Sequence, residues 1–153
     1  MFIFITFAIG CNEVQQTPLQ RKLIESKDLT GNYRDAFKAT LQVLQDYEYA
    51  IKNTDYDSGV IHGETGIIQD SHGIMRWVEA TATLEQFGDN TVKARLTLLE
   101  RAKVSSQYGT QEKSRPVEQP EIFNRMYDDI QKEIFIRSNL NKSSLINSRP
   151  GIE

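Results

Sequence analysis

Residues 75–101 read MRWVEATATLEQFGDNTVKARLTLLER and alternate apolar with polar side chains on both sides of a turn. Successive side chains of a strand point to opposite faces, so the alternation predicts two strands that are each buried on one face. The apolar faces hold Val78, Ala80, Ala82 and Leu84 on the first strand and Val92, Ala94, Leu96 and Leu98 on the second. This stretch therefore predicts a long antiparallel hairpin.

Both faces of the hairpin indicate the same register. A three-residue loop over 88–90 opposes apolar to apolar side chains, whereas a two-residue turn would oppose apolar to polar ones. The apolar pairs are Leu84–Ala94, Ala82–Leu96 and Ala80–Leu98, and the outer pairs are Glu85–Lys93, Thr81–Thr97 and Trp77–Arg101. Such a loop needs a left-handed residue at its third position, for which Asn90 is suited.

A helix and three shorter strands are predicted before the hairpin. Asn32 caps the helix, with Asp35 three residues later. The apolar stripe of this helix consists of Ala36, Phe37, Thr40, Leu41, Leu44 and Tyr47. Weak alternation predicts a first strand over 19–27, and strands over 49–53 and 60–64 flank a segment rich in turn-forming residues.

After the hairpin, the sequence predicts a loop, a helix and a tail. Residues 104–119 are polar and have no regular pattern, which is typical of a loop. Pro120 then opens a helix, at a position where proline is tolerated. Its apolar stripe consists of Ile122, Phe123, Met126, Tyr127, Ile130, Ile134 and Phe135. Periodicity is lost beyond Ser138, so residues 139–153 are predicted to form a flexible tail.

The predicted elements follow the order β-α-β-β-β-β-α in a single domain over residues 19–138. An antiparallel sheet of about five strands, apolar on one face, buries that face under two amphipathic helices. The fold class predicted from the sequence is therefore α+β. With 39% hydrophobic and 25% charged residues, the composition is typical of a globular domain.

No pattern in the sequence predicts catalysis, a cofactor or a metal. His62 and His72 flank a bend that also holds Asp57, Glu64 and Asp70, but their spacing matches no ligand motif, so solvated histidines are favoured. No serine lies in the G-x-S-x-G context of a nucleophile. The formal net charge of -3 favours neither nucleic acid nor an anionic lipid surface as a partner. We therefore predict that the protein is not an enzyme.

The first eleven residues, MFIFITFAIGC, are apolar and end in the single cysteine of the chain, Cys11. Residues 8–11 (AIGC) resemble the lipobox of bacterial lipoproteins, which implies cleavage before Cys11 and a diacylglycerol on its sulfur. Residues 1–10 are then a signal peptide, too short to span a bilayer, and residues 11–18 a tether. A signal peptide normally opens with positive charge, which here only the amino group of Met1 supplies. A true start of the chain upstream of Met1 is therefore an open alternative.

The residue after the cysteine bears on location. Asn12 stands where the inner-membrane retention signal of enterobacterial lipoproteins would be Asp, which implies a protein anchored in the outer membrane and facing the periplasm. The alternative to a lipoprotein is a frayed apolar N-terminus with a buried free cysteine.

Several segments carry a family resemblance: AFKA (36–39) with Leu41 and LQD (44–46), YAIKNTD (49–55), DSGVI (57–61) and IQKEIFI (130–136). They are similar to the BamC-like helix-grip domains of envelope lipoproteins. This resemblance covers residues 19–138 and implies a helix-grip fold in the bacterial envelope. The characterised member is an accessory subunit of an outer-membrane assembly machine, so the resemblance implies no catalytic residues.

Two functions fit these observations. The first is a lipid-anchored binding or scaffolding domain, accessory to a membrane protein complex. The alternative is a carrier of an apolar ligand in a cavity between the sheet and the C-terminal helix. Ala80, Ala82 and Ala94 would leave room for such a ligand, or would let the helix pack closely.

The outer face of the hairpin carries the candidate binding residues: Met75, Trp77, Leu99 and Arg101. Together they would form an apolar patch rimmed by charge, and exposed patches of this kind often mark interaction sites. Trp and Arg are also enriched at binding hot spots. The alternative is that the predicted loop over 104–119, or the tether, covers Trp77.

Overall fold

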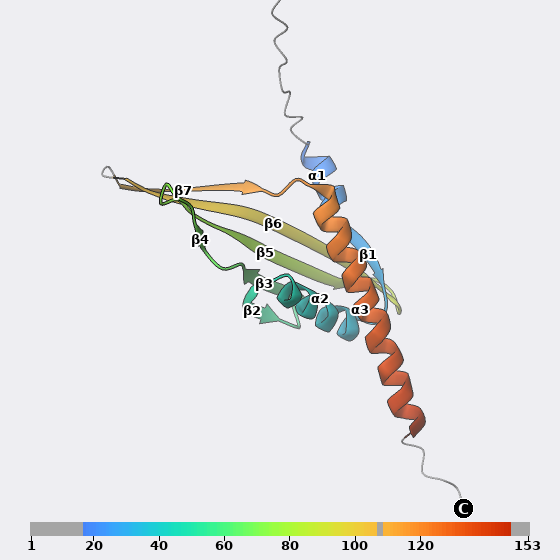
Figure 1. The fold of residues 1–153 in the computed structure, drawn as a ribbon. Coiled ribbons are helices and arrows are strands. Elements are labelled where there is room, and N and C mark those ends of the chain that lie inside the picture. Colours follow the sequence, from blue (N-terminus) through green and yellow to red (C-terminus); the bar gives the residue numbers. More distant parts are fainter. Residues whose placement is uncertain (1–16, 107–108, 148–153) are drawn as a thin grey trace, which may run out of the picture.

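One antiparallel sheet of seven strands organises the computed structural model of this chain, which describes residues 17–106 and 109–147. Its main strand order is β1-β6-β5-β3-β2, while β7 pairs with β6 and β4 pairs with β5 (Figure 1). The elements are α1 (Pro18–Glu25), β1 (Ser26–Thr30), α2 (Tyr33–Asp46), β2 (Ala50–Asp55), β3 (Val60–Glu64), β4 (Ile68–Gln69), β5 (Met75–Gln86), β6 (Thr91–Ser106), β7 (Gly109–Pro116) and α3 (Pro120–Asn147). The predicted α+β class with an antiparallel sheet is confirmed.

The β5–β6 hairpin has the predicted register on both faces. Leu84 pairs with Ala94 on the apolar face, and Trp77 pairs with Arg101 on the outer face. The Phe87 N–H donates to the Thr91 carbonyl at 2.8 Å and closes the three-residue loop. The left-handed residue of this loop is Gly88, with φ 81°, so the prediction of Asn90 was wrong. Glycine adopts positive φ without the steric penalty that a Cβ imposes.

Helices α2 and α3 cover the apolar face of the sheet, and the core lies between these two layers (Figure 1). Asn32 caps α2 as predicted, because its Oδ1 accepts the Asp35 N–H at 2.8 Å. Leu41 and Tyr47 of the predicted stripe are only partly buried, whereas Ala39 and Val43, outside it, are buried. The α3 stripe is buried except at its two ends, where Ile122 and Phe135 are 39% and 66% exposed. The prediction that these two residues belong to the stripe was therefore wrong.

The predicted first strand, 19–27, is wrong over most of its length, because residues 18–25 form α1. The Thr17 hydroxyl accepts the Gln20 N–H at 3.3 Å, and the Gln20 side chain accepts the Thr17 N–H at 2.9 Å. This reciprocal capping box, with Pro18 at the first helical position, specifies a helix start. Pro18, the last residue of the predicted tether, thus belongs to the folded part. Only Ser26–Thr30 pair as a strand.

The predicted loop over 104–119 is also wrong, because β6 continues to Ser106 and β7 returns beside it. Lys103 pairs with Glu112, and Glu100 pairs with Arg115. The Arg115 Nε donates to the Glu100 carboxylate at 2.7 Å. Cross-strand charge pairs therefore stabilise a hairpin arm whose sequence is polar on both faces.

Helix α3 does not end near Ser138, where loss of periodicity predicted a tail, but continues to Asn147. The Asn141 Nδ2 donates to the Asp35 carboxylate at 3.2 Å, and this carboxylate also accepts the Asn32 amide at 2.7 Å. Asp35 is only 4% exposed. The C-terminal part of α3 therefore contacts the start of α2. Residues 148–153, the rest of the predicted tail, lie outside the described residues.

The Tyr127 side chain closes a gap along β6. Strand β1 pairs as far as Arg95, and pairing on the β7 side resumes at Leu98, whose carbonyl accepts the Val117 N–H. Between them, the Leu96 N–H donates to the Tyr127 hydroxyl at 3.0 Å, and this hydroxyl donates to the Glu25 carbonyl. Burial raises the pKa of Tyr127 well above its usual range. One side chain of α3 thus replaces the missing strand partner.

Candidate partner-binding surface on the outer face of the sheet

The structure brings all four candidate residues together on the sheet face opposite the helices. Trp77 lies directly opposite Arg101, and Met75 lies opposite Lys103. Leu99 lies opposite Glu79, two residues further along each strand. We call these residues, Met75, Trp77, Glu79, Leu99 and Arg101, the Trp77 surface. Their common face follows from strand alternation, because the adjacent Ala80 and Leu98 point to the opposite face and are buried beneath the helices.

Polar contacts fix the side chains of this surface. The Arg101 Nε and Nη2 both donate to the Glu79 Oε2, at 3.0 and 2.9 Å. The Trp77 Nε1 donates to the other carboxylate oxygen of Glu79 at 3.4 Å. Arg101 also approaches Glu112 of β7, with 3.8 Å between Nη1 and Oε1. Glu79 therefore joins the indole and the guanidinium in one arrangement, with Glu112 at the rim.

Trp77, Met75, Leu99 and Arg101 are all partly buried, between the two predicted extremes of an open patch and a covered one. Residues 109–116 do not fold over the indole, because they extend the sheet sideways as β7 (Figure 1). The side chains of Arg101 and Glu79 are 28% and 21% exposed, so the ion pair is reachable from solvent. The surface is therefore partly exposed.

Glu112 is the member of this neighbourhood that the sequence prediction missed. A sequence signal for it was present, because antiparallel pairing of residues 99–106 with 109–116 opposes Lys103 to Glu112 and Glu100 to Arg115. This is the same charge-pairing argument that predicts the β5–β6 register. The absence of hydrophobic alternation in 109–116 concealed the strand.

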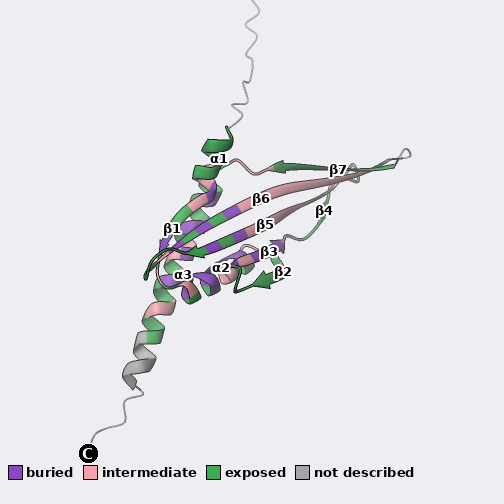
Figure 2. Ribbon diagram, turned by 180° about the vertical axis from the view of Figure 1, so that it is seen from behind, coloured by how far each residue is buried: buried purple, intermediate pink, exposed green. Residues whose placement is uncertain are grey.

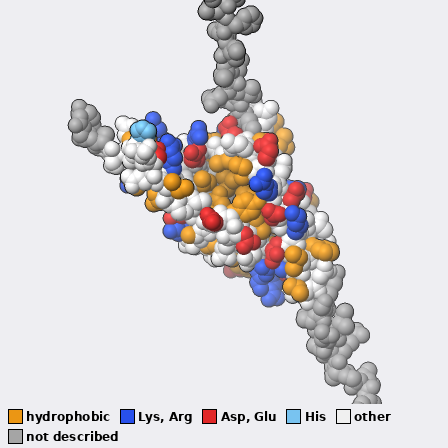
Figure 3. All heavy atoms as spheres, viewed as in Figure 1, with side chains coloured by type: hydrophobic (Ala, Val, Ile, Leu, Met, Phe, Trp, Pro, Cys, Tyr) orange, Lys and Arg blue, Asp and Glu red, His pale blue; other side chains and the backbone are white. Residues whose placement is uncertain are grey.

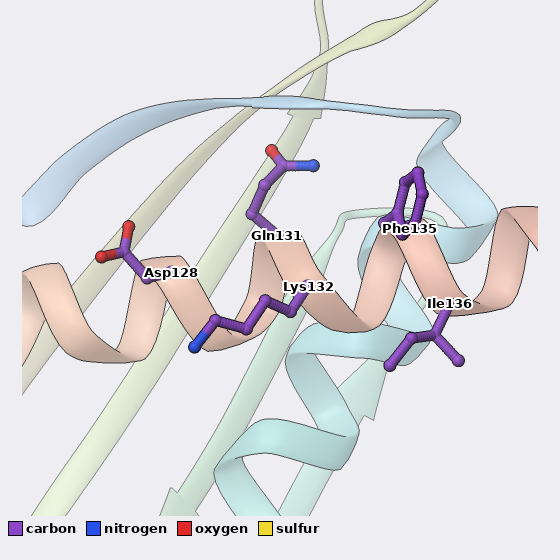
Figure 4. Close-up of a pocket in the computed structure, with 5 residues that line it drawn as sticks. All are labelled: Asp128, Gln131, Lys132, Phe135 and Ile136. Carbon is purple, nitrogen blue, oxygen red and sulfur yellow. The ribbon is translucent and has the colours of Figure 1, made fainter.

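Helix α3 carries a second candidate surface on its outer side. Its open pocket, about 690 Å³, is lined by Asp128, Gln131, Lys132, Phe135 and Ile136 (Figure 4). The Gln131 side chain forms two hydrogen bonds of 2.9 Å with the Thr30 backbone: its Nε2 donates to the carbonyl, and its Oε1 accepts the N–H. Lys132 pairs with Asp129 at 2.9 Å, and Asp129 accepts the Tyr47 hydroxyl at the same distance. With all five lining residues on one helix, this pocket is a shallow surface.

The ligand-carrier alternative needs a cavity between the sheet and α3. Ala80, Ala82 and Ala94 are at most 2% exposed and lie in the packed core, where they let helices and sheet approach closely. Hydrophobic side chains do reach the surface beside α2 and α3 (Figure 3). Leu41, Val78 and Val117 are partly buried residues that pack against the core.

His62 and His72 lie on different elements. His62 is on β3, with its Nδ1 3.1 Å from the Thr81 hydroxyl, and His72 lies in the turn between β4 and β5. Within residues 17–106 and 109–147, no three His, Cys, Asp or Glu side chains gather as metal ligands would. Over the same described part, no helix is both long and apolar enough to cross a membrane. The predicted lipidation site, Cys11, lies outside the described residues.

The fold and this surface define a small α+β domain with one helix-covered sheet face and one face that presents a fixed Trp–Glu–Arg arrangement. No protein-family model matches the chain, and no curated protein matches it in sequence.

Proposed function

We propose that this protein is a lipid-anchored binding or scaffolding lipoprotein of the bacterial envelope, accessory to a membrane protein complex. The Trp77 surface carries the proposal. It combines an indole, a guanidinium and two apolar side chains on a sheet face opposite the helices. Trp and Arg are the side chains that most often dominate binding free energy at interfaces.

The geometry of the Trp77 surface suits recognition of a protein. Glu79 holds the indole and the guanidinium before any partner arrives, so less side-chain freedom is lost on binding. Glu112 at the rim is 52% exposed and leaves a charged border. An apolar centre with a polar rim is the usual anatomy of a protein interface.

The location in this proposal comes from Cys11 and its lipobox-like context. Cleavage after residue 10 and acylation at Cys11 would anchor the domain in the outer membrane, facing the periplasm. One acyl chain binds a membrane only marginally, whereas two or more anchor stably. The helix-grip likeness of the α+β fold belongs to this proposal and accords with an accessory envelope subunit.

Fractionation of Cys11→Ser against the wild type tests the anchor. The wild type should sediment with membranes and carry the mass of its acyl chains. We expect the variant to lose the added mass and to leave the membrane fraction. An unchanged mass and distribution would overturn the lipoprotein assignment.

Fluorescence tests the binding surface, because Trp77 is the only tryptophan. Iodide should quench part of its emission in the free protein, as the indole is partly exposed. Addition of solubilised envelope proteins should shift the emission to the blue and reduce the quenching, whereas a heat-denatured preparation should not. An emission that responds to neither preparation would contradict partner binding at Trp77.

A further inference from the structure

Helix α1 has two faces with different partners. Arg21, Ile24 and Glu25 point toward the fold: Arg21 forms an ion pair of 2.8 Å with Glu118, and Glu25 accepts Arg95 at 2.9 Å. Leu19 and Leu23 lie one turn apart on the other side and are 69% and 73% exposed. The capping box and the two ion pairs hold α1 in place, so the leucines cannot turn inward without breaking these contacts.

The position of this leucine pair in the chain limits what can cover it. Five residues lie between Cys11 and Thr17, which makes six steps along the chain, and a fully extended chain spans at most about 3.6 Å per step. Helix α1 therefore begins within roughly 22 Å of any acyl chains on Cys11. If the proposed anchor is present, the membrane surface is always within reach of Leu19 and Leu23.

We propose that Leu19 and Leu23 insert into the surface of the bilayer that holds the Cys11 anchor. This inference rests on the proposed lipid anchor and adds a second, non-covalent contact to it. An apolar helix face of this kind lies in the boundary between headgroups and acyl chains. Lys22, exposed between the leucines, extends its ammonium toward the headgroups. The contact depends on apolar burial, so it does not conflict with the negative net charge.

This contact would orient the whole domain. Helix α1 lies against the start of α3 (Figure 1), and Arg21 pairs with Glu118, two residues before α3 begins. Helix α3 then runs 28 residues, about 42 Å, toward the opposite end of the molecule. Its exposed Phe135, Ile136 and Leu140 are therefore held away from the membrane.

Quenching of an introduced tryptophan tests the insertion. The acylated full-length protein carries Trp77→Phe together with Leu23→Trp and is placed in phosphatidylethanolamine–phosphatidylglycerol vesicles. The matched control carries Lys38→Trp, on an exposed position of α2. With lipids brominated near the headgroup end of the acyl chains, the Leu23→Trp emission should fall about twofold, because interfacial helices insert 5–10 Å. The control emission should not change.

Flotation of the same samples separates the two proposals. If the protein floats with the vesicles but Leu23→Trp is unquenched, the anchor stands and the insertion is overturned. A blue-shifted but unquenched Leu23→Trp would mean that protein, such as a second copy, covers the leucines, which also overturns it. If the protein purified from membranes carries a free Cys11 thiol and does not float, the anchor itself fails and the insertion fails with it.

Discussion

The two halves of the β5–β6 hairpin belong to the same strands but have different surroundings. In the half near the turn, Ala80, Leu84, Ala94 and Leu98 are almost fully buried beneath α2 and α3. In the half beyond the helices, Trp77 and its neighbours are partly exposed, and Figure 2 shows this half of β5 and β6 largely in the intermediate colour. Packing fixes the first half, whereas cross-strand polar contacts fix the second. The packed core and the proposed binding surface therefore lie at different ends of one hairpin.

The largest expected effects come from the helices that cover the packed half. Phe37→Ala or Ile130→Ala should lower the free energy of unfolding by about 2–5 kcal/mol, because each removes a large buried side chain. Equilibrium denaturation measures this change. A midpoint that neither substitution moves would show that these helices do not cover the core.

Tyr127→Phe should cost about 1–3 kcal/mol, because the buried Leu96 N–H loses its acceptor. The substitution also predicts a pH effect. The folded state raises the pKa of Tyr127, so its contribution is complete below the unfolded value, about 10, and is lost as pH rises through the folded value. Denaturation at increasing alkaline pH should therefore destabilise the wild type more than the variant. Parallel pH profiles would contradict this role.

Asn141→Ala should cost about 0.5–1.5 kcal/mol, the usual net value of a hydrogen bond, because Asp35 loses one donor. The sequence alone predicts that truncation of the chain after Ser138 has little effect on its stability. The structure predicts instead that truncation costs at least as much as Asn141→Ala. If the truncated chain has the denaturation midpoint of the wild type, the contact between α3 and Asp35 adds nothing.

The smallest effect on stability is expected in the exposed half. Arg101→Met removes a solvent-accessible ion pair and should change the free energy of unfolding by less than about 1 kcal/mol. It should nevertheless reduce the blue shift of Trp77 on addition of envelope proteins. A stability loss as large as that of Ile130→Ala would mean that Arg101 has a structural role.

The difference between the two halves also explains which parts of the fold the sequence predicts. Register and core stripes follow from hydrophobic periodicity, so residues such as Leu84, Ala94 and Ile130 are assigned correctly. Strand β7 and residues 135–141 of α3 bury little apolar surface, and periodicity carries no signal there. Helix α1 was missed because Leu19 and Leu23, four residues apart, share a face in both a strand and a helix.

The candidate site was predictable in part for the same reason. Alternation placed Met75, Trp77, Leu99 and Arg101 on one face, and the structure brings them together. Their degree of exposure was not predictable, since it depends on where β7 runs. Glu79 stood on the predicted face, but its simultaneous contacts with the indole and the guanidinium depend on side-chain geometry.

Site-specific photo-crosslinking in intact envelopes tests the central claim most directly. A photoreactive phenylalanine derivative replaces Leu99 in the full chain and, as the matched control, Glu85, which lies on the same sheet face near the turn. We expect a discrete adduct with one envelope protein from position 99, its loss when Trp77→Ser is added, and none from position 85. Equal adducts from both positions, or none from position 99, would contradict a partner-binding role for the Trp77 surface.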